Sequence, residues 1–318
     1  MASKSRHYLN QPWYIILFIF VLSLVAGTLL SSVSYVLSPI QKQAAEFDRN
    51  QQMLMAAQII SYDNKFQIYA EGDWQPAVYN TKKQILEKSS STPPQVTVAT
   101  LCSYFQNFVR VLLTDSQGNL SSFEDHNLNL EEFLSHPTSS VQDHSLHVIY
   151  AILANDESSK KLSSSQVAKN PVSIESIILP IKGFGLWGPI YGFLALEKDG
   201  NTVLGTCWYQ HGETPGLGAN ITNPQWQQNF RGKKVFLASS SGETDFAKTT
   251  LGLEVIKGSV SALLGDSPKA NSAVDGISGA TLTCNGVTEA FANSLAPYRP
   301  LLTFFANLNS SGESHDNQ

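Results

Sequence analysis

The sequence predicts an α+β fold, a mostly antiparallel sheet with packed helices, on a single N-terminal transmembrane helix. Three features indicate this fold. An uncharged apolar run lies near the N-terminus, short β-type segments joined by glycine turns follow residue 170, and a helical apolar pattern follows residue 286. A chain of 318 residues is long enough to bury a sizeable core.

The apolar run "WYIILFIFVLSLVAGTLLSSVSYVLSPI" extends from Trp13 to Ile40 without a charged residue. About 20 apolar residues are enough to span a bilayer. We therefore expect an N-terminal cytoplasmic segment at 1–12 and a transmembrane helix at 13–37. A cleavable signal peptide is the alternative, but its apolar core is normally only about 7–15 residues long.

The residues that flank this run predict its orientation. Lys4 and Arg6 precede the run, whereas only Lys42 follows it closely. Because basic residues are retained on the cytoplasmic side of a membrane, the N-terminus is expected in the cytoplasm. The main domain is then expected on the periplasmic side of the inner membrane.

Charge and cysteine content exclude several classes of function. The formal net charge is −5, which argues against a nucleic-acid partner. Cys102, Cys207 and Cys284 are far apart and form no CxxC motif, so we expect no metal site and no disulfide framework. Cys207 lies in an apolar run and is expected to be a buried thiol. His211 and Glu213 have no further ligand at a suitable spacing, so they are weak metal candidates.

Residues 41–170 are expected to form a helical stalk and the N-terminal part of the exported domain, with a polar insert. The stretch 41–60 contains few helix breakers and is expected to continue the membrane helix. The stretch 145–154, "SLHVIYAILA", is compatible with a strand or with a buried helix. No motif in 85–168 indicates a function.

Four segments after residue 170 have the composition of strands: "SIESIILPI", "PIYGFLALE", "TVLGTCWYQ" and "KKVFLAS". Val287, Ala290, Phe291 and Leu295 then follow at helical spacing, which predicts an amphipathic helix facing the core. These elements are expected to form one domain over 171–300. Residues 301–318 are expected to be a C-terminal tail with a disordered end.

Two short motifs resemble enzyme signatures without fulfilling them. "GFGLWG" at 183–188 has the dinucleotide spacing, but Pro189 and a strand-like segment follow it instead of a helix. We therefore interpret it as a glycine-rich connection between two strands. "GISGA" has Ala280 where a hydrolase elbow requires glycine.

Two other glycine-rich segments are the candidates for a ligand site. "HGETPGLGAN" at 211–220 provides glycines that let the backbone approach a ligand, with polar Glu213 and Thr214 beside them. "DGISGATLTC" at 275–284 leads directly into the predicted helix, whose free amides and dipole favour a phosphate. An ordinary helix cap by Ser278 or Thr281 is an equally good interpretation from the residues alone.

"DGISGAT" resembles the flavinylation motif Asp-x-x-Ser/Thr-Gly-Ala-Thr of the FMN-binding domain family. "GLWGPIYGFLAL" and "HGETPGLGANI" resemble two further signature stretches of that family. Together, over roughly 175–296 and the anchor, they resemble the C subunits of sodium-translocating NADH:quinone reductases. The resemblance implies an FMN-binding domain at 171–300 and an FMN phosphoester on Thr281.

This resemblance also implies how the site is built. A flavin transferase would recognise Asp275 and reach Thr281 past the small residues Gly279 and Ala280. Ser278 and the backbone around Gly279 would hold the phosphate, with Thr283 as a further donor.

The isoalloxazine ring would lie against Leu217 and Trp187. Its polar edge would face Glu213, Thr214 and the amides of Gly216 and Gly218. Lys233 would place a positive charge near the flavin, although a solvated surface lysine is the simpler interpretation of that residue.

The resemblance further implies an electron relay with no catalytic acid or base in this chain. Its partners would be the membrane, the other subunits of a complex that passes electrons from NADH towards quinone and exports sodium, and the transferase during maturation. One alternative is the FMN subunit of a ferredoxin-linked ion-translocating relative. Others are an anchored exported binding domain without a redox role, and a structural assembly subunit.

Overall fold

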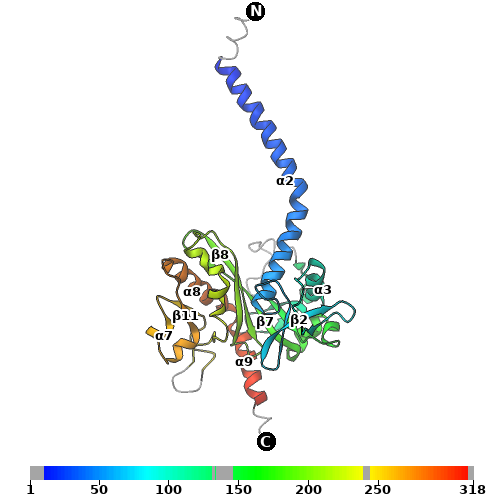
Figure 1. Cartoon of the computed structure of the whole chain (residues 1–318), viewed down its shortest axis with the longest axis vertical. Helices are drawn as coiled ribbons and strands as arrows, with labels where there is room; N and C mark the ends of the chain where they lie inside the picture. Colours follow the sequence, from blue (N-terminus) through cyan, green and yellow to red (C-terminus); the bar gives the residue numbers. More distant parts are fainter. Residues whose placement is uncertain (1–10, 131–132, 134–145, 239–243, 314–318) are drawn as a thin grey trace, which may run out of the picture. The chain divides into compact units, whose positions relative to one another are not determined.

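The computed structural model describes residues 11–130, 133, 146–238 and 244–313 of the chain. The chain divides into two compact units, with the boundary between Asp48 and Arg49. The first unit contains most of one long helix, and the second contains every strand of the described residues (Figure 1). The expected cytoplasmic segment lies almost wholly outside the described residues.

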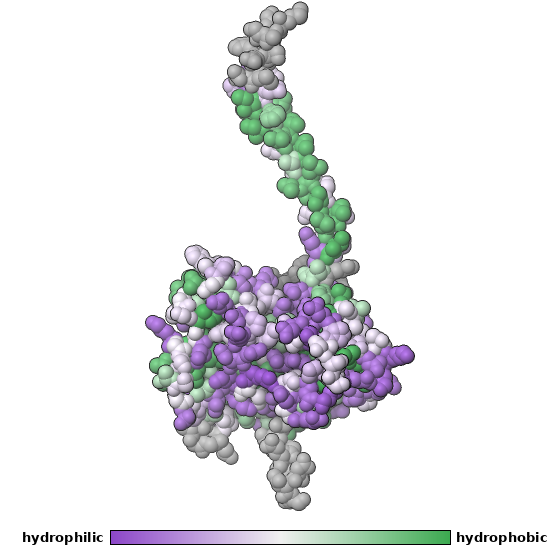
Figure 2. Space-filling model, in the orientation of Figure 1, coloured by the Kyte–Doolittle hydropathy of each residue, from purple (hydrophilic) through white to green (hydrophobic). Residues whose placement is uncertain are grey.

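Helix α2 (Pro12–Ala56) is long and apolar enough to cross a membrane. The face of its apolar stretch seen in Figure 2 is mostly green. Exposed hydrophobic side chains at the consecutive positions 15–22 lie on every side of the helix. A helix that is apolar on all sides needs either a protein core or a lipid environment around it. None of its most apolar window is buried by the protein itself.

The centre of the second unit is a six-stranded antiparallel sheet with the order β5-β4-β6-β7-β8-β9. This arrangement confirms the predicted α+β class. Its strands are β4 (Val109–Thr114), β5 (Leu120–Ser121), β6 (His147–Leu153), β7 (Ile174–Phe184), β8 (Pro189–Glu197) and β9 (Val203–Gln210). The first three of the four predicted strands are β7, β8 and β9.

Two smaller sheets accompany it. An antiparallel sheet contains β1 (Gln67–Ala70), β2 (Asp73–Asn80) and β3 (Ile85–Lys88). A parallel pair contains β10 (Glu254–Ile256) and β11 (Ala273–Asp275). The pair β10-β11 ends beside the second glycine-rich motif, so it determines where that motif begins.

Further helices lie between these strands or follow the last of them. The α-helices are α3 (Val98–Phe108), α5 (Ser164–Lys169), α6 (Pro224–Gln228), α7 (Val260–Leu263), α8 (Thr281–Leu295) and α9 (Arg299–Glu313). The 3-10 helices are η1 (Glu124–His126), η2 (Ser159–Lys161), η3 (Pro171–Ser173), η4 (Gly218–Thr222), η5 (Pro268–Ser272) and η6 (Ala296–Tyr298).

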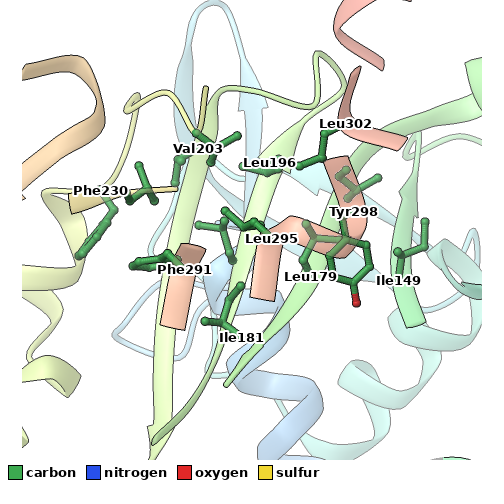
Figure 3. Packing of buried hydrophobic residues seen from close by; sticks show 14 of the residues in the cluster. Ile149, Leu179, Ile181, Leu196, Val203, Phe230, Phe291, Leu295, Tyr298 and Leu302 are labelled. Carbon is green, nitrogen blue, oxygen red and sulfur yellow. The ribbon is translucent and has the colours of Figure 1, made fainter. Parts of the chain in front are cut away.

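Helix α8 packs on one face of the large sheet, chiefly against β7. Figure 3 shows Phe291 and Leu295 of this helix among buried side chains of the sheet, including Leu179, Leu196 and Val203. The ring of Phe291 lies 5.5 Å from those of Trp208 and Phe230. The predicted apolar face at 287–295 is therefore the face that this helix buries.

The last turns of α2 contact the opposite face of the sheet. The Cys207 thiol on β9 donates to the side-chain oxygen of Gln52 at 2.8 Å. A Cβ atom on Gly205 would lie only 2.7 Å from the carbonyl oxygen of Ala56. Both faces of the sheet are thus covered, which explains why β8 is almost continuously apolar. Cys207 is buried, as expected.

Three segments differ from the sequence-based expectation. The boundary expected at residue 170 falls between β6 and β7, which are neighbours in one sheet. The expected tail is helical through Glu313, because Leu301, Leu302 and Phe305 pack into the core; residues 314–318 lie outside the described part. Within "KKVFLAS", whose last residue lies outside the described part, Lys234 and Phe236 form only isolated bridges. The Lys234 amide donates to the Asn271 carbonyl of η5, and the Val235 amide donates to the Asn201 carbonyl between β8 and β9.

Candidate functional site

A pocket of about 220 Å³ lies where the two glycine-rich segments meet the turn between β7 and β8. "GFGLWG" contains the last two residues of β7 and the turn itself, 185–188. It therefore connects two antiparallel strands, as the sequence predicts. The pocket is lined by Leu186, Glu213, Thr214, Leu217, Gly218, Gly279, Ala280, Thr281, Leu282 and Thr283. Three segments that are distant in the sequence therefore meet at one site.

The first turn of α8 forms one wall of the pocket and has no side-chain cap. Its N-cap residue is Ala280, which has no side-chain oxygen to accept from the helix amides. Neither Ser278 nor Thr281 acts as a cap, so the ordinary-cap interpretation does not describe this helix end. Thr281 is exposed at the first helical position, and Gly279 before it has a φ of 76°. The site therefore combines an accessible hydroxyl with uncapped amides that favour an anion.

Glu213 lies inside the site and is only 5% exposed. Its Oε1 accepts from the amide of Trp187 at 2.9 Å, and its Oε2 accepts from the amide of Leu186 at 3.1 Å. The Thr283 hydroxyl also donates to Oε2. Burial raises the pKa of the Glu213 carboxyl, but these three hydrogen bonds outweigh it and hold the pKa below its ordinary value. The carboxylate is therefore ionised at neutral pH.

Trp187 and Leu217 provide exposed apolar surface beside the pocket. The indole N–H of Trp187 donates to the Thr214 hydroxyl at 3.0 Å, while the side chain remains 69% exposed. Leu217 is 44% exposed, and its Cδ2 would lie 3.0 Å from a Cβ atom on Gly279. An indole held at one edge, with most of its surface free, is suited to contact a planar ring.

Five of the predicted site residues do not line the pocket. Trp187 lies beside it, three others have structural roles elsewhere, and Ser278 has neither position. The Asp275 carboxylate accepts from the Val260 amide at 2.7 Å. The Lys233 ammonium donates to the carbonyl of Ala270 at 2.7 Å, so Lys233 is partly buried instead of freely solvated. Gly216 has a φ of 77°, a left-handed backbone conformation that favours glycine in the loop 211–220. Ser278 is exposed.

Two lining residues, Leu186 and Leu282, were not predicted from the sequence. They are 48% and 61% exposed, respectively, although both are large and apolar. Each lies inside a motif that the sequence makes conspicuous, "GFGLWG" or "GATLTC". An apolar residue inside a glycine-rich or hydroxyl-rich motif was the signal that could have identified them.

Comparison with known families places this pocket within a recognised domain. The FMN-binding domain model matches residues 185–296. That range includes all ten residues that line the pocket. It also begins in the β7–β8 turn and ends just after α8.

Two of the named relatives resemble the chain over nearly its full length, and a third resembles about a third of it. The C subunit of the Na(+)-translocating NADH-quinone reductase of Chlamydia trachomatis is 83% identical, with 99% of this chain and 100% of the relative covered. The protein of the same name from Chlamydia caviae is 56% identical over 97% of both chains. The Pseudomonas aeruginosa protein is 46% identical over 36% of this chain and 39% of its own.

A solved structure has the same fold. The crystal structure of the Na(+)-translocating NADH-quinone reductase C subunit from Parabacteroides distasonis matches with a TM-score of 0.51. The match covers 84% of this chain and 97% of that one, at 24% sequence identity.

Proposed function

Because the chain belongs to the family of C subunits of Na(+)-translocating NADH-quinone reductases, we propose that it is a membrane-anchored electron carrier with FMN bound covalently to Thr281. The chain has an FMN-binding domain and is a subunit of an oxidoreductase complex. One observation carries the covalent part of the proposal. The exposed Thr281 hydroxyl stands at the uncapped start of α8, inside a pocket built by both glycine-rich segments.

The residues present fit a flavin mononucleotide. The uncapped amides at the start of α8 would hold the phosphate, next to the backbone of Gly279 and Ala280. Leu217 and the free surface of Trp187 would support the ring. Thr214 accepts from the Trp187 indole, so its own hydroxyl proton remains available to a ligand. When bound, the flavin supplies the redox chemistry, and this chain sets its position and surroundings.

Attachment requires an activated flavin nucleotide and a transferase. The Thr281 oxygen forms the new bond to phosphorus, the bond from phosphorus to the leaving group breaks, and the hydroxyl proton is given up. Gly279 and Ala280 leave an open approach to this hydroxyl, since neither has a side chain larger than a methyl group. Asp275 and Ser278, outside the pocket, are the residues that we assign to recognition by the transferase.

We also propose that α2 anchors the chain in the inner membrane, with the N-terminus in the cytoplasm and the FMN-binding domain, 171–300, on the periplasmic side. The uncharged run from Trp13 to Ile40 and the basic residues before it support this topology. An alkaline phosphatase fusion after residue 313 should be active, and a phosphatase joined in front of residue 1 of the full chain should be inactive. The reverse pattern would contradict the orientation.

The test of covalent attachment is the intact mass of the full chain co-produced with a flavin transferase. The wild-type chain should gain the mass of one FMN less one water. Thr281→Ala should gain nothing, whereas the control Thr92→Ala, which alters an exposed threonine far from the motif, should gain the same mass as wild type. An unmodified wild-type chain, with the transferase active on another substrate, would contradict the proposal and favour an anchored binding domain without a redox role.

A further inference from the structure

We propose that Glu213 is the positioning residue of this pocket: its carboxylate holds the β7–β8 turn and the first turn of α8 in the arrangement that presents Thr281. This inference rests on the proposed function and deepens it. From the sequence, Glu213 is expected to face the flavin directly. Its observed hydrogen bonds instead connect two segments of the protein.

All three hydrogen-bond donors around the carboxylate come from outside its own loop. The amides of Leu186 and Trp187 belong to the β7–β8 turn, and the hydroxyl of Thr283 belongs to α8. An ionised carboxylate only accepts hydrogen bonds, so it matches a set of three donors. The Thr283 side chain is 1% exposed, which makes its contact with Glu213 a buried one. Loss of one partner would leave a buried polar group unsatisfied.

Two glycines make room for this carboxylate. A Cβ atom on Gly185 would lie 2.5 Å from Oε1 of Glu213. A Cβ atom on Gly218 would lie 2.6 Å from Oε2 and 2.5 Å from the hydroxyl oxygen of Thr283. Gly218 was expected to let the backbone approach a ligand, but its nearest neighbours are these two side chains. Gly185 and Gly218 therefore leave the space that the Glu213 carboxylate occupies, and Gly218 also leaves room for its contact with Thr283.

The consequence for the site follows from the position of Thr283. It lies two residues after Thr281 in the same first turn of α8, so its bond to Glu213 fixes the turn that carries the proposed attachment residue. On the other side, the carboxylate fixes the Trp187 amide, and the Trp187 indole is held by Thr214. One buried side chain thus sets the relative positions of three pocket walls.

The test uses the full chain with a flavin transferase and four variants: Glu213→Gln, Thr283→Val, Thr283→Ser and the control Glu289→Gln. Glu289 is an exposed residue of α8 that does not line the pocket. The rate of FMN transfer is followed by intact mass, and folding is followed by circular dichroism. Glu213→Gln places an NH₂ group against hydrogen-bond donors, so it should slow FMN transfer about tenfold. Thr283→Val removes the hydroxyl that donates to Glu213 and should slow transfer by a similar factor. Thr283→Ser and the control should keep the wild-type rate.

A second readout separates positioning from general loss of stability. The midpoint potential of the FMN in the folded, loaded Glu213→Gln chain should rise, because a buried negative charge beside the pocket has been removed. Transfer at the wild-type rate with an unchanged potential would overturn the inference alone. A wild-type chain that takes up no FMN would overturn it together with the proposed function. If Glu213→Gln does not fold, the Thr283→Val variant still tests the inference. FMN transfer to Thr283→Val at the wild-type rate would overturn it.

Discussion

The indole N–H of Trp226 donates to the backbone carbonyl of Asp275 at 2.9 Å. Trp226 belongs to α6, and Asp275 ends β11 and begins the motif that leads to Thr281. The carboxylate of the same aspartate accepts from the Val260 amide at the start of α7. Asp275, the first residue of the motif, is therefore bonded to both α6 and α7. This structural role is separate from the recognition role that we propose for it.

Substitution of Asp275 should separate its structural role from recognition by the transferase. Asp275→Ala removes the acceptor for the Val260 amide and should lower the free energy of unfolding by about 1 kcal/mol, as loss of a helix-terminal acceptor does. Asp275→Asn keeps an acceptor oxygen, so it should be nearly as stable as wild type. It should nevertheless receive less FMN if the transferase reads the charge.

Urea unfolding and intact mass together measure both effects. Asp266→Asn is the matched control, because Asp266 is exposed and lies outside the motif. Full FMN transfer to Asp275→Asn would show that the transferase does not read the negative charge. If the unfolding free energy of Asp275→Ala equals that of the wild type, the hydrogen bond from the Val260 amide contributes no stability.

Gly286→Ala should destabilise the protein, although helix propensity alone predicts the opposite. In an exposed helix this change would stabilise by about 1 kcal/mol. Here, a Cβ atom on Gly286 would lie 2.0 Å from the carbonyl oxygen of Phe184, which is backbone of β7. Helix α8 would have to move away from the sheet, and overpacking of this kind costs about 1–3 kcal/mol. Set against the gain in helix propensity, this leaves an expected net loss of about 1 kcal/mol in urea unfolding.

Gly212→Ala is the control for this prediction. No atom lies within 4 Å of the Cβ position on Gly212, and its φ is outside the left-handed region. Its unfolding free energy should therefore remain within about 0.5 kcal/mol of wild type. A Gly286→Ala variant that is more stable than wild type would mean that α8 packs less closely on β7 than the structure describes.

The sequence was most informative where structure depends on local pattern. The strands β7, β8 and β9 and the helix α8 were predicted because alternation, glycine turns and helical spacing are properties of neighbouring residues. Strands β4 and β6 were not predicted as one pair. Val109–Thr114 pairs with residues 147–152 across a long intervening segment, and no local pattern identifies such a partner.

The site shows the same difference between local and distant contacts. The attachment candidate Thr281 and the glycine turn before it were identified from one continuous motif. The bond between Glu213 and Thr283 joins residues 70 positions apart, and it depends on how β9 and α8 meet in the folded chain. The positions of Lys233 and Asp275 likewise depend on backbone groups, the Ala270 carbonyl and the Val260 amide, which the sequence alone does not place nearby.

The stability of the protein should depend on the ionisation of Asp156. The Ser158 hydroxyl donates to this carboxylate, as do the Ser159 amide at 2.9 Å and the Ser159 hydroxyl at 2.8 Å. These bonds lower the pKa of Asp156 from 3.8 to about 2. Because the folded-state pKa is depressed, the stabilisation is present above the unfolded pKa and is lost as pH falls through the folded one.

Asp156→Asn measures this contribution. At pH 7 the wild type should be more stable by about 1 kcal/mol, once solvent screening of this partly exposed group is taken into account. The difference in unfolding free energy should shrink as the pH falls from about 5 to about 2, since the wild-type carboxyl becomes protonated over that range. Urea unfolding of both chains at a series of pH values tests this. A difference that stays constant down to pH 2 would show that the shape of the side chain, and not its charge, stabilises the turn at Ser158 and Ser159.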